Sequence, residues 1–265
     1  MSYSSWTLVG ERRPDAAVRL FCFPYAGAGA SAFRDWHRHI PGNIEVIGVQ
    51  LPGRENRFHE PHHTRLADLI APLKQMVTQL ADKPFFFFGH SLGALVAFEL
   101  ARVLQRDGLP LPFHLVASGM RAPHLRSRDE QLHLMPDDEL LEKIDEYNGT
   151  PRALLQDREL MRFFLPQLRA DFAICETYEH LAGTRLTCPI TAFGGQHDPD
   201  VSPDQLAAWS VHTTGPFRHQ LFDGDHFFIH PCQQAVLALL GPIATGFQET
   251  SLAGRSSMRI GDAAG

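Results

Sequence analysis

The region from Phe85 to Leu104 is the part of the sequence that most constrains the fold. Four consecutive phenylalanines, residues 85–88, lead into Gly-His-Ser-Leu-Gly at 89–93 and then into a helical pattern. A short run made only of apolar residues is typical of a strand that is buried on both faces of a parallel sheet. Glycines on either side of a serine allow a sharp turn with the serine side chain at its apex. We therefore predict a strand–turn–helix unit with Ser91 at the turn.

The rest of the chain repeats this alternation of strands and helices. Apolar runs predict strands at 18–23, 44–49, 113–117, 189–193 and 217–222. Helical spacing of apolar residues predicts a helix that begins at Ser31 and further helices at 64–80, 92–104, 204–211 and 231–247. Short connections between alternating elements favour an α/β fold, with a mostly parallel central sheet flanked by helices on both faces.

Two parts of the chain depart from this pattern. Residues 120–185 have a mostly helical pattern without a clear strand, and Pro136-Asp137-Asp138 is a typical helix start. We expect this block to be an inserted helical lid on a core formed by residues 1–119 and 186–250. Residues 251–265 are small and polar, which predicts a disordered tail.

The residues at 89–93 match the G-x-S-x-G nucleophile elbow of α/β-hydrolases, with a strand before the motif and a helix after it. A serine is a poor nucleophile at neutral pH, so Ser91 needs a histidine base and an acid that orients this histidine. In this fold the acid and then the histidine follow the serine along the chain. The sequence therefore predicts a serine hydrolase with the α/β-hydrolase fold.

The loops after the last two predicted strands supply candidates for both partners of Ser91. Asp198 is the expected orienting acid, and Asp200 in the same loop is the alternative. His226 directly follows the last strand and is the expected base. His230 is a weaker alternative, because a helix is expected to begin immediately after it. All of these residues follow strand ends, so we expect them at the same edge of the sheet as the serine.

The tetrahedral oxyanion of acyl transfer needs backbone N–H donors. One donor is expected from Leu92, which directly follows the nucleophile at a helix N-terminus. The other is expected from the loop after the first strand, where small residues between Pro24 and Ala30 allow a tight turn. Ala26 is the expected donor in that loop.

Composition argues against several other classes of protein. The formal net charge of −6 argues against broad nucleic-acid binding, which needs a basic surface. No apolar run reaches the length of a membrane-spanning helix, and charged residues near the N-terminus argue against a secretory signal, so we expect a cytoplasmic protein. The four cysteines form neither a C-x-x-C pair nor a Cys/His metal pattern, which predicts free thiols and no metal site.

Five short segments combine into a more specific pattern. They are Phe23-Pro24-Tyr25-Ala26-Gly27, Leu51-Pro52-Gly53-Arg54-Glu55, Phe88-Gly89-His90-Ser91-Leu92-Gly93, Gly194-Gly195-x-x-Asp198 and Gly224-Asp225-His226-Phe227. Together they resemble type II thioesterases, the standalone partners of nonribosomal peptide and polyketide synthases, over about residues 20–247. The Leu-Pro-Gly-Arg segment combined with Gly-Asp-His-Phe is more specific than G-x-S-x-G alone.

The resemblance implies hydrolysis of acyl thioesters on the phosphopantetheine arm of a carrier protein, which removes misprimed or stalled acyl groups. It implies an acyl or peptidyl carrier protein domain as partner and no cofactor, because the pantetheine belongs to the substrate. We expect a monomer. The alternatives are a chain-terminating thioesterase for medium-chain acyl-carrier proteins, a small-molecule serine esterase, and a catalytically silent carrier-binding protein.

Two groups of residues in the expected lid have more than one interpretation. One group is apolar and either lines an acyl channel or packs the lid onto the core: Leu154, Leu155, Leu160, Phe163, Phe164, Leu168 and Phe172. The other group is basic, and a solvated surface is a better interpretation of it than a contact with an acidic carrier protein: Arg121, Arg126 and Arg128.

Overall fold

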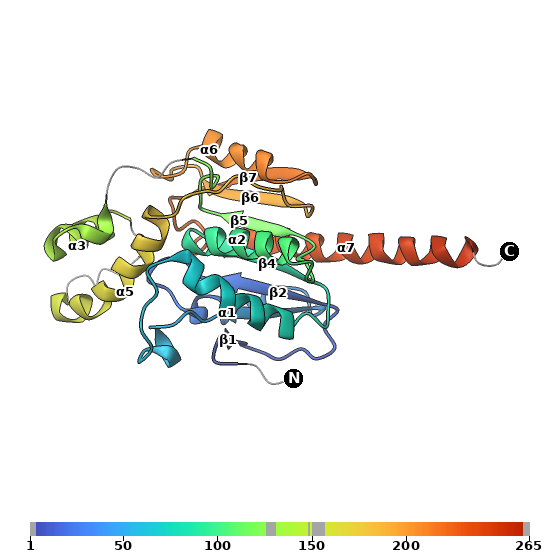
Figure 1. Ribbon diagram of the computed structural model, residues 1–265, viewed down its shortest axis with the longest axis horizontal. Helices are drawn as coiled ribbons and strands as arrows, with labels where there is room; N and C mark the ends of the chain where they lie inside the picture. Colours follow the sequence, from blue (N-terminus) through green and yellow to red (C-terminus); the bar gives the residue numbers. More distant parts are fainter. Residues whose placement is uncertain (1–3, 126–130, 148, 150–156, 262–265) are drawn as a thin grey trace.

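A single mostly parallel sheet forms the centre of the protein (Figure 1). The structure is a computed structural model that describes residues 4–125, 131–147, 149 and 157–261. The strands of the described residues lie in the order β1-β3-β2-β4-β5-β6-β7 and pair in parallel, except that β1 is antiparallel to β3. Their bounds are β1 Thr7–Leu8, β2 Val18–Phe23, β3 Ile44–Val49, β4 Phe85–His90, β5 Leu115–Ser118, β6 Ile190–Gly195 and β7 Phe217–Phe222. This arrangement confirms the predicted α/β fold.

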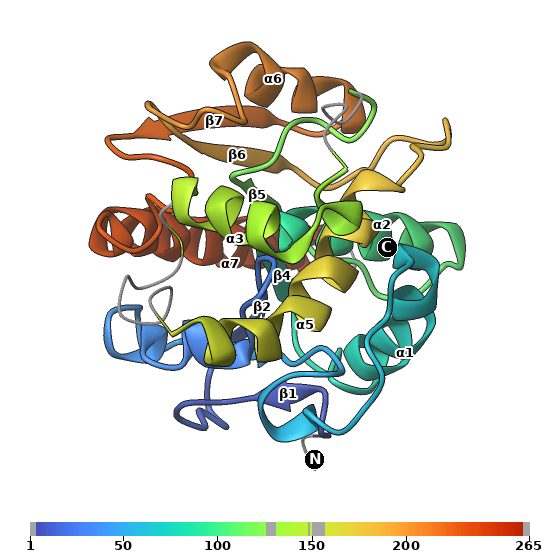
Figure 2. The same ribbon diagram turned by 90° about the vertical axis from the view of Figure 1, so that its left-hand side faces the viewer.

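Helices cover both faces of the sheet. The helices α1 (Leu66–Gln79) and α2 (Leu92–Arg106) lie on one face, and α7 (Gln233–Gly261) lies on the other (Figure 2). The short helix α6 (Pro203–Ala207) and the 3₁₀ helix η5 (Ala208–His212) connect β6 to β7. The sheet is therefore enclosed by helices, as long parallel strands require.

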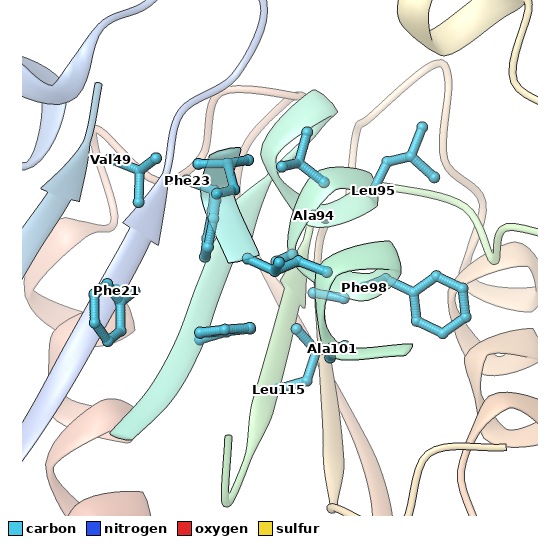
Figure 3. Close-up of a cluster of buried hydrophobic side chains, with 14 of the residues drawn as sticks. Phe21, Phe23, Val49, Ala94, Leu95, Phe98, Ala101 and Leu115 are labelled. Carbon is cyan, nitrogen blue, oxygen red and sulfur yellow. The ribbon is translucent and has the colours of Figure 1, made fainter. Parts of the chain in front are cut away.

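The four phenylalanines of β4 divide between two hydrophobic cores. Phe85 and Phe87 belong to the core beneath α1 and α2, whereas Phe86 and Phe88 belong to the core beneath α7. Successive side chains of a strand point to opposite faces, so a continuous apolar run fills both sides at once. Figure 3 shows the first of these cores, in which Phe21 and Phe23 of the neighbouring strand face α2. The elbow thus begins from a strand that is fixed on both faces.

The helical insertion, residues 120–185, contains α3 (Asp137–Glu146), α5 (Arg158–Glu176) and the 3₁₀ helix η4 (Leu132–Leu134), and no strand among its described residues. These helices lie beyond the carboxyl ends of the strands (Figures 1 and 2). They share a small hydrophobic cluster of their own, which includes Leu140, Met161 and Leu165. The insertion therefore covers the edge of the sheet at which β4 turns into α2.

Three local features differ from the sequence predictions. The two-residue edge strand β1 was not predicted, because so short an element has no readable period. The expected helix from Ser31 is replaced by two 3₁₀ helices, η1 (Ala30–Phe33) and η2 (Trp36–Arg38), in a segment too short to sustain an α-helix. Finally, α7 continues to Gly261 where a tail from Ser251 was expected to be disordered, because extending an existing helix avoids the cost of nucleation. Residues 262–265 lie outside the described residues.

Candidate active site

Ser91 stands on a strained turn between β4 and α2. Its backbone adopts φ 52° and ψ −120°, a conformation that costs about 1–3 kcal/mol in a residue other than glycine. The strain is held by the surroundings, because the Ser91 N–H donates to Ser118 O at 2.7 Å. A Cβ at Gly93 would lie 2.0 Å from Phe23 O, so only glycine allows α2 to approach the end of β2 this closely. The turn has the geometry of a nucleophile elbow.

Asp198 and His226 are joined by a hydrogen bond at the same edge of the sheet. His226 Nδ1 lies 2.8 Å from Asp198 Oδ2, and the Asp198 side chain is fully buried. The other carboxylate oxygen, Oδ1, accepts from the backbone N–H groups of Asp200 at 2.8 Å and Val201 at 3.2 Å. A carboxylate can only accept, so Nδ1 carries the proton and Nε2 is left as the basic nitrogen.

The two alternative residues occupy different positions. The Asp200 carboxylate lies close to the pair, since Asp198, Asp200 and His226 have ligand atoms within 4.8 Å of one another. This distance would suit a cation, yet both Asp198 oxygens are engaged by the histidine and by backbone amides, so the group is organised around His226. His230 instead bonds through Nε2 to Tyr25 OH at 3.0 Å, away from the cavity that contains His226. The geometry favours Asp198 and His226.

Two backbone N–H groups are available for an oxyanion. Leu92 is the first residue of α2, and the first N–H groups of a helix have no partner inside it. Ala26 lies in the loop after β2, and its N–H donates no hydrogen bond to any residue that the structure describes. Ala26 and Ser91 line the same cavity. The expected donors are therefore placed around the expected nucleophile.

A cavity of about 350 Å³ lies between the sheet and the helical insertion. Ser91 and His226 line its floor, and the insertion supplies an apolar wall made of Leu132, Ile144, Met161, Phe164, Leu168 and Phe172. Among the expected lid residues, Leu160 and Phe163 are exposed instead, and Leu154 and Leu155 lie outside the described residues. Of the basic group, Arg121 lines the cavity, and Arg126 and Arg128 lie outside the described residues.

Two further side chains in the site have chemistry that needs an explanation. Cys175 also lines the cavity, but burial raises the pKa of its thiol to about 12, so it remains protonated and is a poor nucleophile. His90 is fully buried, with Nδ1 2.9 Å from Ser118 Oγ and its ring 5.3 Å from the ring of His226. Burial holds the pKa of His90 well below its ordinary value, so a neutral ring packs beside the candidate base. The sequence gave no signal for this role beyond the place of His90 in the motif.

Comparison with known proteins identifies the family. A family model described as a thioesterase domain matches residues 18–243. A relative from Brevibacillus parabrevis, named linear gramicidin dehydrogenase LgrE, is 43% identical over 91% of this chain and 92% of its own length. Thioesterase PikA5 of Streptomyces venezuelae is 40% identical over 82% of this chain and 77% of its own.

A solved structure agrees with these relatives. BorB, a type II thioesterase from the borrelidin biosynthetic cluster, superposes with a TM-score of 0.84 at 33% identity, over 91% of this chain and 98% of that one. The likeness extends over the sheet and the insertion together. The chain belongs to the thioesterase domain family, and it is a thioester hydrolase with the α/β-hydrolase fold.

Proposed function

We propose that the chain is a type II thioesterase that hydrolyses acyl thioesters on the phosphopantetheine arm of a carrier protein. It would thereby remove misprimed or stalled acyl groups from a nonribosomal peptide or polyketide synthase. One observation carries the proposal: a single cavity collects Ser91, His226 and the backbone of Ala26 beneath a helical cover with an apolar wall. The names of PikA5 and BorB support the pathway.

The geometry supports a two-stage mechanism that begins with acylation of Ser91. Its Oγ attacks the thioester carbonyl carbon, and its proton passes to Nε2 of His226. Asp198 holds the imidazole in this tautomer through the 2.8 Å bond to Nδ1 and stabilises the imidazolium that forms. The N–H groups of Ala26 and Leu92 stabilise the oxyanion, and each such donor typically contributes about 3–4 kcal/mol to lowering the barrier.

The second half of the mechanism releases the products. When the tetrahedral intermediate collapses, the C–S bond breaks and His226 returns its proton to the pantetheine sulfur. A water molecule then attacks the acyl-serine, with His226 again taking a proton, and the acid leaves. All of the proposed groups come from one subunit, which is consistent with the expected monomer.

A second candidate function, dinucleotide-dependent oxidoreduction, is suggested by the name of LgrE and by the spacing Gly27-x-Gly29-x-x-Ala32 after β2. In dinucleotide-binding folds this spacing opens an α-helix whose N-terminus binds pyrophosphate. Here the loop opens the four-residue 3₁₀ helix η1, and the Glu55 carboxylate accepts from Ser31 N–H at 3.2 Å. A carboxylate therefore occupies the place of an anion site, and we favour hydrolysis.

The proposal is tested by offering acyl-phosphopantetheinyl carrier proteins beside matched acyl-coenzyme A and free acyl esters. We expect the highest kcat/KM on the carrier-bound acyl groups, with release of free acid and of the carrier thiol in equal amounts. Equal or better turnover of the free esters would contradict the carrier-directed function and favour a small-molecule esterase. A single strong preference for medium chains on one fatty-acid carrier would favour a chain-terminating enzyme.

A further inference from the structure

Arg54 and Asp171 form a buried ion pair between two parts of the chain that are distant in sequence. The guanidinium makes two bonds to the carboxylate: Nη2 to Oδ1 at 2.7 Å and Nη1 to Oδ2 at 3.0 Å. The side chains are 5% and 1% exposed, respectively. Arg54 belongs to the Leu-Pro-Gly-Arg segment after β3, and Asp171 lies on α5 of the insertion. A paired charge of this kind is costly to bury, so we asked what it holds.

Both members of the pair also bind the loop that contains the candidate oxyanion donor. Asp171 Oδ2 accepts from Gly27 N–H at 2.8 Å, which is the amide next to that of Ala26. Arg54 Nη1 donates to Ala28 O at 2.9 Å, one residue further along. Two consecutive peptide units of the loop are thus fixed by one ion pair, directly beside the amide that faces the cavity.

Gly27 adds a steric constraint between the same loop and α5. Its backbone has φ 79°, and a Cβ there would lie 2.7 Å from Leu168 Cδ2 of α5. The left-handed conformation at Gly27 turns the chain so that its N–H reaches Asp171, while Leu168 packs over the turn. The loop therefore has its observed conformation only while α5 lies against it.

We propose that Arg54 and Asp171 are positioning residues that hold the Ala26 N–H in place for the oxyanion, and that Asp171 makes this arrangement depend on the closed position of α5. The inference rests on the proposed serine mechanism. Neither side chain touches the substrate; each acts through the loop. When α5 moves away, the loop loses its anchor, so full transition-state stabilisation is restricted to the covered state of the cavity.

The test compares Asp171→Ala, Asp171→Asn and Arg54→Lys with wild type on a small acyl-pantetheine thioester. We expect Asp171→Ala to lower kcat about 100-fold, as loss of one oxyanion donor does. The KM should change by less than about threefold, because the ground-state carbonyl gains little from the donor. Asp171→Asn and Arg54→Lys, which keep part of the hydrogen bonding, should fall between Asp171→Ala and wild type.

A transition-state probe distinguishes positioning from a merely structural role. An acyl trifluoromethyl ketone forms a covalent bond between its carbonyl carbon and Ser91 Oγ; the proton goes to His226, and the carbonyl oxygen becomes an oxyanion. Its affinity should fall in parallel with kcat/KM across the variants, whereas the affinity of the matched methyl ketone should stay constant. Unchanged trifluoromethyl ketone affinity beside a reduced kcat would overturn the proposal.

The protein offers a matched control pair. Arg19 Nε and Glu45 Oε2 lie 2.9 Å apart, with side chains 7% and 2% exposed, at the opposite end of β2 and β3 from the site. Glu45→Ala should lower the Tm as Asp171→Ala does, yet leave kcat and ketone affinity near wild type. Equal catalytic losses in both variants would show that destabilisation alone causes the effect and would overturn the proposal.

A double variant separates stability from positioning if the single variants fold poorly. Replacing the pair by apolar residues, Arg54→Met with Asp171→Leu, removes the unpaired buried charge, and such exchanges often restore stability. We expect a Tm near wild type with kcat still reduced. Recovery of kcat together with Tm would overturn the inference, whereas a wild-type protein without thioesterase activity would instead contradict the proposed function.

Discussion

The sheet and the helical insertion are held in place by different interactions. The sheet lies between two extensive apolar cores, and β4 contributes side chains to both. The insertion has a cluster of only six buried residues, and α5 is tied to the loops beneath it by the buried pair of Arg54 and Asp171. On its outer side Phe163 is 55% exposed and stacks on Phe58, which is 44% exposed.

The difference teaches where rigidity is needed. The candidate nucleophile, base and acid all follow strands of the sheet, so their geometry is fixed by the most tightly packed part of the molecule. The apolar wall of the cavity comes from the insertion, whose fewer contacts permit local opening at lower free energy. Chemistry and cover are thus assigned to regions of different stability.

The largest expected effect would break the comparison if it failed, because it tests whether the chemistry belongs to the sheet. Ser91→Ala should lower kcat by about 10⁴-fold or more, since removal of a nucleophile leaves only the binding and oxyanion contributions. Steady-state hydrolysis of an acyl-pantetheine thioester measures this. Ser202→Ala, which removes the capping box of α6, is the control: it should lose about 1 kcal/mol of stability but keep its activity. A folded Ser91→Ala variant with wild-type turnover would remove Ser91 from the mechanism.

The next effect concerns the acid that orients the base. Asp198→Asn should lower kcat by up to about 10⁴-fold, because an amide at Oδ2 can present its NH₂ to Nδ1 and favour the wrong histidine tautomer. Asp200→Asn, measured side by side, should have a much smaller effect, since the bond to His226 is retained. If Asp200→Asn alone abolished turnover, the acid would be Asp200 and the assignment would be reversed.

A pair of phenylalanine truncations compares the stability of the two regions directly. Phe88→Ala removes a fully buried ring that packs on Trp36 and should lower the free energy of unfolding by about 3–5 kcal/mol. Phe163→Ala removes an exposed ring of the insertion and should cost less than about 1 kcal/mol. Denaturant unfolding of both variants gives the two values. Equal losses would mean that the insertion is as firmly packed as the sheet.

The smallest expected effect is a dependence of stability on pH that originates on the sheet side. Burial, together with His124, His180 and Arg102 nearby, lowers the pKa of His212 to about 3. An unfolded histidine binds a proton near pH 6.5, about the ordinary value, so the unfolded state is favoured as the pH falls below that value. The Tm should therefore fall by a few degrees between about pH 7 and pH 5.

The matched variant for this effect is His212→Asn, because it removes the titrating group from beneath α2. Its Tm should be lower than that of wild type at neutral pH, since the bond between His212 Nε2 and His124 Nδ1 at 2.8 Å is lost. Its Tm should then depend less on pH over the same interval. A slope identical to that of wild type would show that other groups cause the loss of stability in acid.

The sheet and its edge could be predicted from the sequence because they depend on local patterns. The run at Phe85–Phe88 needs only the two-residue period of a strand, and the residues after each strand are brought to one edge by parallel topology. The end of α7 was wrong because small polar residues were interpreted as disorder, although they tolerate helix once it has started.

The pair of Arg54 and Asp171 could not be predicted in the same way, because it joins segments more than a hundred residues apart. A weaker signal was present. Asp171 lies three residues after Leu168 and three before Ile174, so an acid occupies the apolar stripe of a helix. Such a position implies a buried cationic partner, but the helical period does not reveal which arginine supplies it.

The contact between Gly93 and Phe23 O has a consequence for altering this protein. The spacing between the serine turn and the loop of Ala26 is set there by backbone against backbone, so no choice of side chain adjusts it. A library that randomises Ile144, Met161 and Phe172 can therefore explore new acyl groups while the reacting atoms keep their separation. Selectivity and turnover should vary as independent traits in such a library, provided that Leu168 and Asp171 are left unchanged.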